Sequence, residues 1–338
     1  EPVNPVPVIQ ETWHEFDFFG TSMKVRAEDK NRFTLKSIEG EDVAKAWKKL
    51  SGKDYDTMLA DCLKIRTDYK LCDWAYLLML LSFSDSFLES YNECILLTAY
   101  LYCQSGYKMR LGATEKELCL LFGTKHQIYG APCFDIDGYY YYQLNGEPKE
   151  LRIANFTFPK EKGMSLVLSD LPKFSRDESD MRTLTAKGYK TISSCSVNKN
   201  LLAFFNNYPA SQLDDNPMTR WALYADTPID AKVKAQLYPT LKTAIAGKTV
   251  PQAADILLDF VQTAFEYEYD DKVWGSDRAF FAEESLYYPY CDCEDRSIFF
   301  SRLVREILGL RVLLVFYPGH LATAVCPLTN MSGDYIML

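Results

Sequence analysis

Histidine is scarce in this chain: only His14, His126 and His320 occur among its 338 residues. Any site that needs an imidazole base therefore has three candidates. Positive charge is also in deficit, with 37 lysines and arginines against 46 acidic residues and a net charge of -9. Because nucleic-acid phosphates call for a basic face, this balance argues against nucleic acid as a partner.

Long hydrophobic runs are missing as well. The longest apolar stretch lies around residues 77–81 and is interrupted at Asp73. That is far short of the ~20 residues a helix needs to cross a bilayer, so we expect no membrane span. The chain is nevertheless 48% hydrophobic, which is ample for the cores of two or three domains.

The ten cysteines do not follow a disulfide-rich pattern, and we expect most of them to be reduced and buried. Cys94, Cys103 and Cys119 lie in apolar surroundings typical of a core. Cys291 and Cys293 with a later histidine resemble a metal-ligand spacing, but a second closely spaced pair is missing. We therefore expect neither a metal nor an organic cofactor.

Cys293 stands in a different environment, at the start of a predicted helix. Glu294 and Asp295 suit a first helical turn, and Gly309 suits the left-handed residue that ends a helix. Between them the apolar residues recur at helical spacing: Phe300, Leu303, Val304 and Ile307. Backbone N–H groups at a helix start stabilise a thiolate, whereas the neighbouring carboxylates disfavour it. Either the acids point away from the sulfur or His320 offsets them.

The residues after this helix predict a β-hairpin that carries a histidine. Residues 311–317 form an apolar strand, Pro318 and Gly319 a turn, and residues 320–325 a return strand that begins with His320. A helix start facing the first residue of a neighbouring strand can bring sulfur and imidazole within hydrogen-bonding reach.

This pattern resembles the catalytic core of the transglutaminase-like superfamily, whose architecture is shared with papain-like proteases. Cys293, Asp295 and Ser297 match the cysteine motif, and His320 with Ala322 matches the histidine strand. The resemblance covers roughly residues 250–338. It implies that Cys293 is the nucleophile and His320 its base.

The resemblance also implies a third catalytic residue, an aspartate on the strand that follows the histidine strand. Residues 333–338 look like the first half of a hairpin, and Asp334 precedes that strand. We therefore expect the third residue beyond Leu338, with Asp334 as a fallback, and we expect a longer chain to be more active. Trp274 and Asp295 are the candidates for oxyanion or substrate binding.

An internal repeat is also predicted. Aligned without gaps, Ser90 falls on Cys293 and Gly106 on Gly309, and both helices precede a basic and apolar strand. His126 follows in the first region, before an Asp137-Gly138 hairpin signal. The first copy would be degenerate, since it has a serine where the nucleophile should be. Chance similarity of two amphipathic helix–strand segments is the alternative.

These observations predict an α+β protein in three parts. Residues 1–150 form an α+β domain with the degenerate repeat, residues 151–216 a β-rich middle region, and residues 217–338 a transglutaminase-like domain with the cysteine at a helix N-terminus packed on an antiparallel sheet. The missing initial methionine and the proline-rich start suggest either a mature protein after signal removal, exported to a bacterial periplasm or cell envelope, or a chain trimmed at its start.

The predicted function is a cysteine-dependent acyl transfer, either hydrolysis of amide or peptide bonds or transamidation. The expected partner is a peptide, a protein or a peptidoglycan-like amide. The alternative is a non-catalytic binding or scaffold protein of the cell envelope that retains the fold. The oligomeric state does not follow from these residues.

Overall fold

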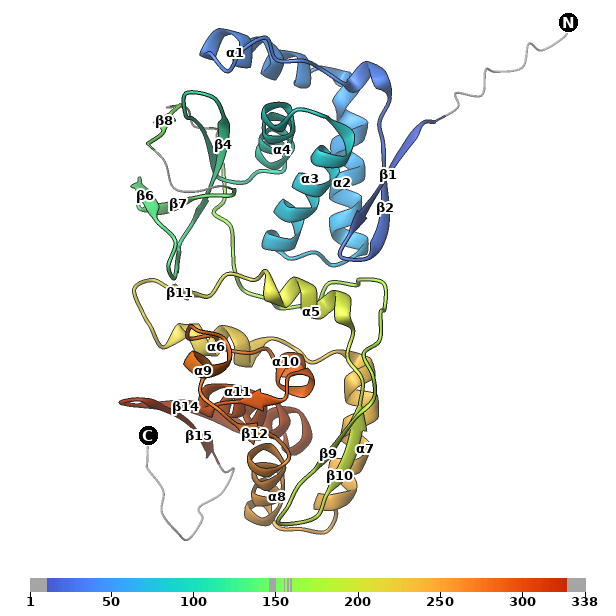
Figure 1. Cartoon of the computed structure of the whole chain (residues 1–338), viewed down its shortest axis with the longest axis vertical. Helices are drawn as coiled ribbons and strands as arrows, with labels where there is room; N and C mark the ends of the chain where they lie inside the picture. Colours follow the sequence, from blue (N-terminus) through green and yellow to red (C-terminus); the bar gives the residue numbers. More distant parts are fainter. Residues whose placement is uncertain (1–10, 146–149, 155, 157, 159, 327–338) are drawn as a thin grey trace, which may run out of the picture. The chain divides into compact units, whose positions relative to one another are not determined.

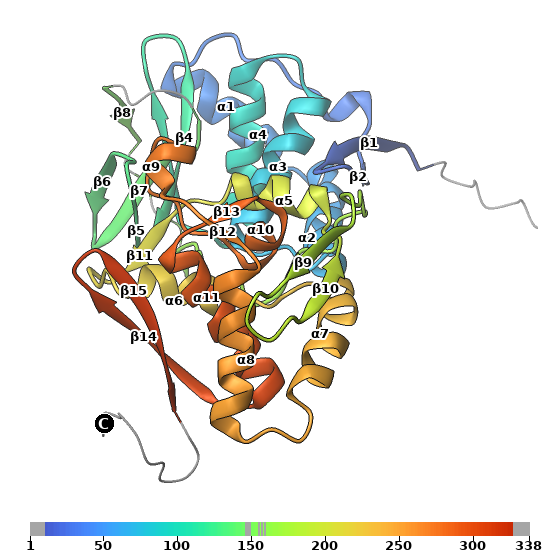
Figure 2. The same cartoon turned by 60° about the horizontal axis from the view of Figure 1, so that its bottom comes forward.

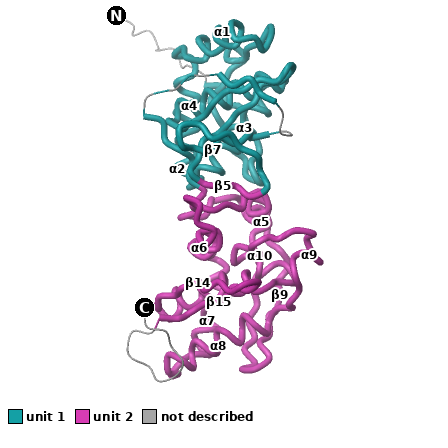
Figure 3. Tube along the Cα trace, turned by 90° about the vertical axis from the view of Figure 1, so that its left-hand side faces the viewer, with its two compact units in different colours: residues 1–125, 130–165 teal, residues 126–129, 166–338 magenta. Residues whose placement is uncertain are grey.

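The computed structural model describes residues 11–145, 150–154, 156, 158 and 160–326. Helices and mainly antiparallel strands make up a mixed fold, in keeping with the predicted α+β class. The chain divides into two compact units, residues 1–125 with 130–165 (unit 1) and residues 126–129 with 166–338 (unit 2; Figures 1 and 3). In the described part of the chain, no helix has both the length and the apolar character needed to cross a bilayer.

Unit 1 combines a group of helices with a five-stranded antiparallel sheet. Its helices are α1 (Gly40–Leu50), α2 (Asp56–Asp68), α3 (Asp73–Phe87) and α4 (Tyr91–Gln104), with short 3₁₀ turns η1 (Asp29–Asn31) and η2 (Lys53–Tyr55). A separate hairpin pairs β1 (Trp13–Phe18) with β2 (Thr21–Arg26). The sheet order is β6-β7-β4-β3-β8, from β3 (Met109–Ala113), β4 (Leu118–Thr124), β6 (Cys133–Ile136), β7 (Tyr139–Gln143) and β8 (Arg152–Ile153).

The β6–β7 turn confirms the hairpin predicted at Asp137-Gly138. Asp137 has φ 53° and Gly138 has φ 70°, and Ile136 pairs with Tyr139. Two successive left-handed residues form the turn that matches the twist of a two-residue hairpin, and the Asp-Gly pair adopts that conformation readily.

Unit 2 holds the predicted cysteine helix. Its helices are α5 (Lys199–Asn206), α6 (Thr219–Asp226), α7 (Ala231–Ile245), α8 (Val250–Thr263), α9 (Asp270–Val273), α10 (Ala282–Tyr287) and α11 (Cys293–Leu303), which continues as a π-helical turn, η3 (Val304–Leu308). Its strands are short pairs: β5 (His126–Ile128) with β11 (Ser211–Leu213), β9 (Arg182–Thr185) with β10 (Ile192–Cys195), β12 (Glu266–Tyr267) with β13 (Tyr290–Cys291), and β14 (Arg311–Tyr317) with β15 (His320–Cys326).

Helix α11 is the centre of unit 2. It contacts α6, α8, α10 and β15, and Figure 2 shows it between α6 and α8 with the β14–β15 hairpin alongside. Ile298, Phe299 and Leu303 are almost fully buried in these contacts. Gly309 ends the helical segment with φ 67°, the left-handed conformation predicted for it. Burial on several faces makes α11 a rigid element for any side chain at its first turn.

The predicted strands after α11 are confirmed. β14 and β15 form an antiparallel hairpin whose last pair is Tyr317 with His320, and Gly319 has φ 73° in the turn. Pro318 followed by a left-handed glycine is typical of a type II turn. His320 is therefore the first residue of its strand, as the sequence indicates.

The middle region, residues 151–216, does not form a unit of its own. Its described residues up to Ser165 belong to unit 1, and those from Leu166 belong to unit 2. The predicted strands there are short, and α5 packs Leu201, Phe204 and Phe205 into the core of unit 2. Strand propensity was right for β9 and β10, but segments of three or four paired residues build no separate core.

Candidate active site

Cys293 is the first residue of α11, and its position is fixed by the capping of that helix. The Asp292 carboxylate accepts hydrogen bonds from the backbone N–H groups of Glu294 at 2.9 Å and Asp295 at 3.4 Å. In return, the Asp295 carboxylate accepts from the Asp292 N–H at 3.2 Å. This reciprocal capping box stabilises the helix start at the residue that carries the thiol. The predicted location of Cys293 is therefore confirmed.

His320 is held near α11 by bonds between the helix and β15. Ser297 Oγ donates to the Leu321 carbonyl at 2.9 Å, and Thr323 Oγ1 donates to the Ser297 carbonyl at 3.1 Å. Ser297 lies one turn beyond Cys293, and Leu321 directly follows His320. These bonds dock the start of the strand on the start of the helix.

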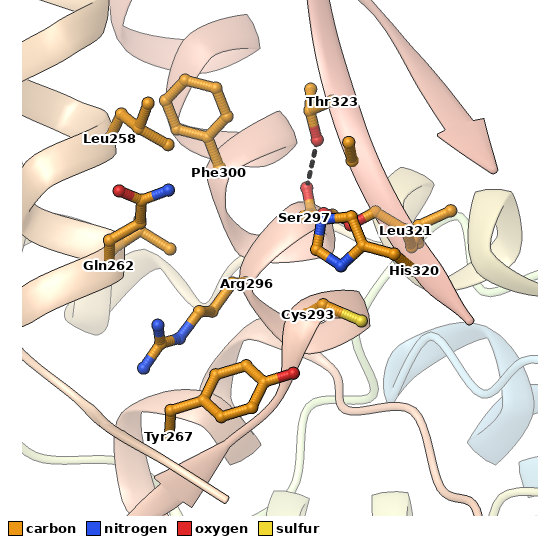
Figure 4. A pocket seen from close by; sticks show the side chains of 12 residues that line it. Leu258, Gln262, Tyr267, Cys293, Arg296, Ser297, Phe300, His320, Leu321 and Thr323 are labelled. Carbon is orange, nitrogen blue, oxygen red and sulfur yellow. Dashed lines mark hydrogen bonds between the residues drawn. The ribbon is translucent and has the colours of Figure 1, made fainter. Parts of the chain in front are cut away.

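Cys293 and His320 line one cavity of about 290 Å³, which Figure 4 shows from close by. The His320 side chain is exposed, and Cys293 is half-buried. No hydrogen bond joins the two side chains in the described part of the chain. The cavity walls come from α8, β12, α11 and β15: Leu258, Val261, Gln262, Tyr267, Cys293, Arg296, Ser297, Phe300, His320, Leu321, Ala322 and Thr323.

Tyr267 is a site residue that the sequence analysis missed. It lies on β12, which runs parallel to β13 and places Tyr267 opposite Cys291. Its hydroxyl lowers the pKa of the Cys293 thiol, and Figure 4 shows this hydroxyl directed at that residue. With 23 tyrosines in the chain, no feature of the sequence distinguishes this one. What distinguishes Tyr267 is the pairing of β12 with β13, the strand that comes just before Cys293.

The electrostatics around Cys293 favour a neutral thiol. Burial raises its pKa most, and the carboxyl groups of Asp292 and Glu294 raise it further. The Leu321 backbone N–H and the Tyr267 hydroxyl oppose them by lowering this pKa, but the net shift is upward. Burial and these carboxyl groups therefore outweigh the stabilisation of a thiolate that a helix start provides. Two of the N–H groups at this helix start already bond to Asp292.

Cys291 is the less suitable of the two neighbouring thiols. It is buried, and burial raises its pKa to about 11. Its sulfur accepts a hydrogen bond from Arg296 Nε at 3.5 Å. Cys291 is not among the residues that line the cavity.

Trp274 and Asp295, the predicted oxyanion or substrate-binding residues, are not among the residues that line this cavity. The Trp274 ring packs edge-on against Tyr288 and Phe280, outside the cavity lining. Asp295 is fully buried, accepts from the Phe280 N–H at 2.8 Å, and has its pKa raised well above the usual range by burial. The Asp295 carboxyl is held in place by the backbone N–H groups that donate to it. Asp334 lies outside the described residues.

Three acidic residues lie close together near the start of α11. Oxygen atoms of Asp270, Asp277 and Glu294 lie within 4.8 Å of one another, a spacing that could hold a cation. The guanidinium of Arg220 already pairs with Asp277 at 2.6 Å and with Glu294 at 3.4 Å. This arginine balances part of the negative charge, and we assign the group a structural role.

The segment of unit 1 that aligns with residues 293–320 has neither the cysteine nor the histidine at the matching positions. Gly106, with φ 87°, lies two residues after the end of α4. The antiparallel β3–β4 hairpin follows and packs on α4, the same order of elements as in α11, β14 and β15. Ser90 aligns with Cys293, and Glu117 aligns with His320. His126 lies instead in unit 2, where it is buried and accepts from the Leu166 N–H.

In unit 1, the Asn92 side chain near the start of α4 bonds to the segment that begins β4. Its Oδ1 accepts from the Leu118 N–H at 2.7 Å and its Nδ2 donates to the Lys116 carbonyl at 3.2 Å, which ties the helix start to the second strand. The shared order of elements agrees with the predicted degenerate repeat. A common origin of the two segments stays a prediction.

Comparison of the chain with protein-family models, curated proteins and solved structures gives no match.

Proposed function

We propose that the chain is a cysteine-dependent acyl-transfer enzyme of the transglutaminase-like type that hydrolyses amide or peptide bonds. The observation that carries this proposal is the shared cavity of Cys293, at the start of α11, and His320, at the start of β15. The cysteine motif and the order of helix, strand, turn and strand support it. The substrate would be a peptide, a protein or a peptidoglycan-like amide.

In the proposed reaction, His320 removes the proton from the Cys293 thiol as the sulfur attacks the substrate carbonyl. The negative charge moves to the carbonyl oxygen, where the Tyr267 hydroxyl can donate a hydrogen bond. The imidazolium then protonates the departing amine, and a thioester remains on Cys293. His320 next deprotonates a water, which attacks the thioester, and the thiol recovers its proton as the acid product leaves.

A protonated resting thiol suits this sequence of steps. Because the pKa of Cys293 is raised, the base must act during the attack rather than before it. Asp334, the fallback candidate for the residue that orients His320, lies outside the described residues. An amine in place of water would give transamidation from the same thioester.

The test is amine release from a panel of fluorogenic peptide amides, together with intact-mass detection of an acyl group on the protein. Cys293→Ala should abolish both signals, and His320→Gln should lower the rate by about 10²- to 10⁴-fold. Cys291→Ala serves as the matched control and should retain most of the activity. Adding hydroxylamine tests for the thioester, because it would convert the acyl group on Cys293 into a hydroxamate. Equal activity in Cys293→Ala would refute the proposal.

The alternative is a non-catalytic binding protein that retains this architecture. The raised pKa of Cys293 favours it, since a neutral thiol without an engaged base is a weak nucleophile. Peptide binding that is the same in the wild type and in Cys293→Ala, with no turnover in either, would select this alternative. Export to a periplasm or cell envelope stays a prediction for either function.

A further inference from the structure

An arginine side chain lines the cavity beside the nucleophile. Arg296 lies on α11 three residues after Cys293, so the two side chains share one face of the helix. Its guanidinium lies 4.9 Å from the centre of the Tyr267 ring. Figure 4 shows the guanidinium between Gln262 and Tyr267. A positive charge therefore lies within the cavity that also holds the thiol.

The Arg296 guanidinium has bonding capacity to spare. Among the described residues its bonds are Nε to the Cys291 sulfur at 3.5 Å and Nη2 to the Phe265 carbonyl at 3.1 Å, two of its five N–H groups. Within the same described residues it makes no ion pair. Other arginines of unit 2 do pair with carboxylates: Arg220, Arg278, Arg302 and Arg305.

The surroundings of Arg296 suit a carboxylate on an otherwise apolar group. Leu258 and Phe300 form an apolar part of the cavity wall. The Gln262 side chain, also labelled in Figure 4, offers a further N–H donor. A guanidinium recognises a planar carboxylate with two parallel hydrogen bonds, which a lysine cannot do. The carboxyl groups that raise the pKa of the thiol, those of Asp292 and Glu294, are already engaged: Asp292 caps the helix, and Glu294 accepts from Arg220 and Trp221.

We propose that Arg296 binds a carboxylate that lies next to the scissile amide, so that the enzyme selects acidic peptide-like acyl donors. Side chains three apart on a helix lie about 5–6 Å apart at their Cβ atoms. That spacing fits a carboxylate on the residue that bears the attacked carbonyl, such as a glutamate side chain or a free α-carboxylate of a side-chain-linked amide. This inference names the substrate class of the proposed function and rests on it.

The first experiment uses two alkylating agents and needs no turnover. Iodoacetate is anionic and iodoacetamide is neutral, and both alkylate a thiol to leave a thioether and release iodide. The ratio of their rates at Cys293, followed by peptide mapping and divided by the ratio for glutathione, reports the local preference for an anion. We expect this normalised ratio to exceed one and to fall about tenfold in Arg296→Gln.

Two further variants make this result decisive. Arg311→Gln removes the same charge from an exposed position at the far end of β14 and should leave the ratio unchanged. Gln262→Glu keeps Arg296 but gives it a carboxylate partner, and should lower the ratio even if Arg296→Gln fails to fold. A ratio that stays at the wild-type value in Arg296→Gln or, should that variant not fold, in Gln262→Glu would overturn the inference.

The second experiment compares kcat/KM for matched fluorogenic amides with Glu, Gln or Lys at the residue bearing the carbonyl. The wild type should prefer Glu over Gln by about tenfold, and Arg296→Glu should instead prefer Lys. Cys293-dependent cleavage with no change of preference in Arg296→Glu would refute the specificity alone. No cleavage of any substrate, together with a wild-type alkylation ratio above one that falls in Arg296→Gln, would refute the proposed function but leave an anion site beside Cys293.

Discussion

Ser297 Oγ donates a hydrogen bond to the Leu321 carbonyl at 2.9 Å, and this bond joins the fifth residue of α11 to the second residue of β15. Cys293 lies one turn before Ser297, and His320 lies one residue before Leu321. Cys293 and His320, the proposed nucleophile and base, therefore share a cavity because a buried hydroxyl docks the two elements. Ser297 has a positioning role in this protein.

Ser297→Ala should loosen this docking. The Leu321 carbonyl would lose a buried donor, which costs about 1–2 kcal/mol in the free energy of unfolding. Because Cys293 and His320 would no longer be held together, the rate of amide hydrolysis should fall more than stability alone explains. Urea unfolding and kcat measured side by side test this. Ser301→Ala, one turn further along α11, is the matched control and should lower stability without a comparable loss of kcat.

Alkylation by iodoacetamide should modify Cys293 far faster than Cys291, since only Cys293 lines the cavity and burial raises the pKa of Cys291 to about 11. The rate at Cys293 should rise with pH through a midpoint above that of a free cysteine, because its pKa is raised. Tyr267→Phe should move that midpoint higher still, since the hydroxyl lowers this pKa. Tyr287→Phe is the matched control and should leave the midpoint unchanged. A midpoint below that of free cysteine would contradict the electrostatic account.

Asp292→Asn should make Cys293 more reactive at neutral pH. The asparagine oxygen still accepts from the helix N–H groups, and asparagine is as good an N-cap as aspartate, so stability should change little. The negative charge that raises the pKa of Cys293 would be gone, and this pKa should fall. We expect alkylation at pH 7.5 to accelerate a few-fold. Asp292→Ala separates the two effects, because it removes the charge and also loses the cap, at a cost of about 1 kcal/mol.

Glu283→Gln should flatten the pH dependence of stability between about pH 5 and 8. The Glu283 carboxyl is buried, Oε1 accepts from the Asp230 N–H, and burial raises its pKa to about 7. A carboxyl whose pKa is higher in the folded state stabilises fully below its unfolded pKa, and that contribution is lost as pH rises through 7. The loss is at most about 3 kcal/mol.

Thermal unfolding at several pH values measures the effect of Glu283→Gln. Glu178→Gln is the control of opposite sign, because Arg176 and Lys232 hold the pKa of Glu178 at about 2. Its stabilising contribution disappears only in acid, so the control should leave the window from pH 5 to 8 unchanged. If Glu283→Gln leaves the slope in that window as steep as in the wild type, another group carries the dependence.

The local sequence was sufficient for the elements that carry Cys293 and His320. Charged first-turn residues, helical spacing and a final glycine predict α11, and an apolar strand with a Pro-Gly turn predicts the β14–β15 hairpin. These signals are local, since capping and turn conformations depend on residues only a few positions apart. The structure adds what depends on residues far apart in the sequence. The middle region is divided between two units, and Asp295 is a buried cap residue.

The sequence by itself determined which residue types stand at a helix start and at a strand start. Only the tertiary structure decided what surrounds them. Tyr267 reaches the thiol because β12 pairs with β13, Arg296 lies in the cavity because α8, α11 and β15 meet around it, and the pKa of Cys293 is raised because packing removes water from the sulfur. Burial and proximity between distant segments depend on the whole fold, and no short pattern of residues encodes them.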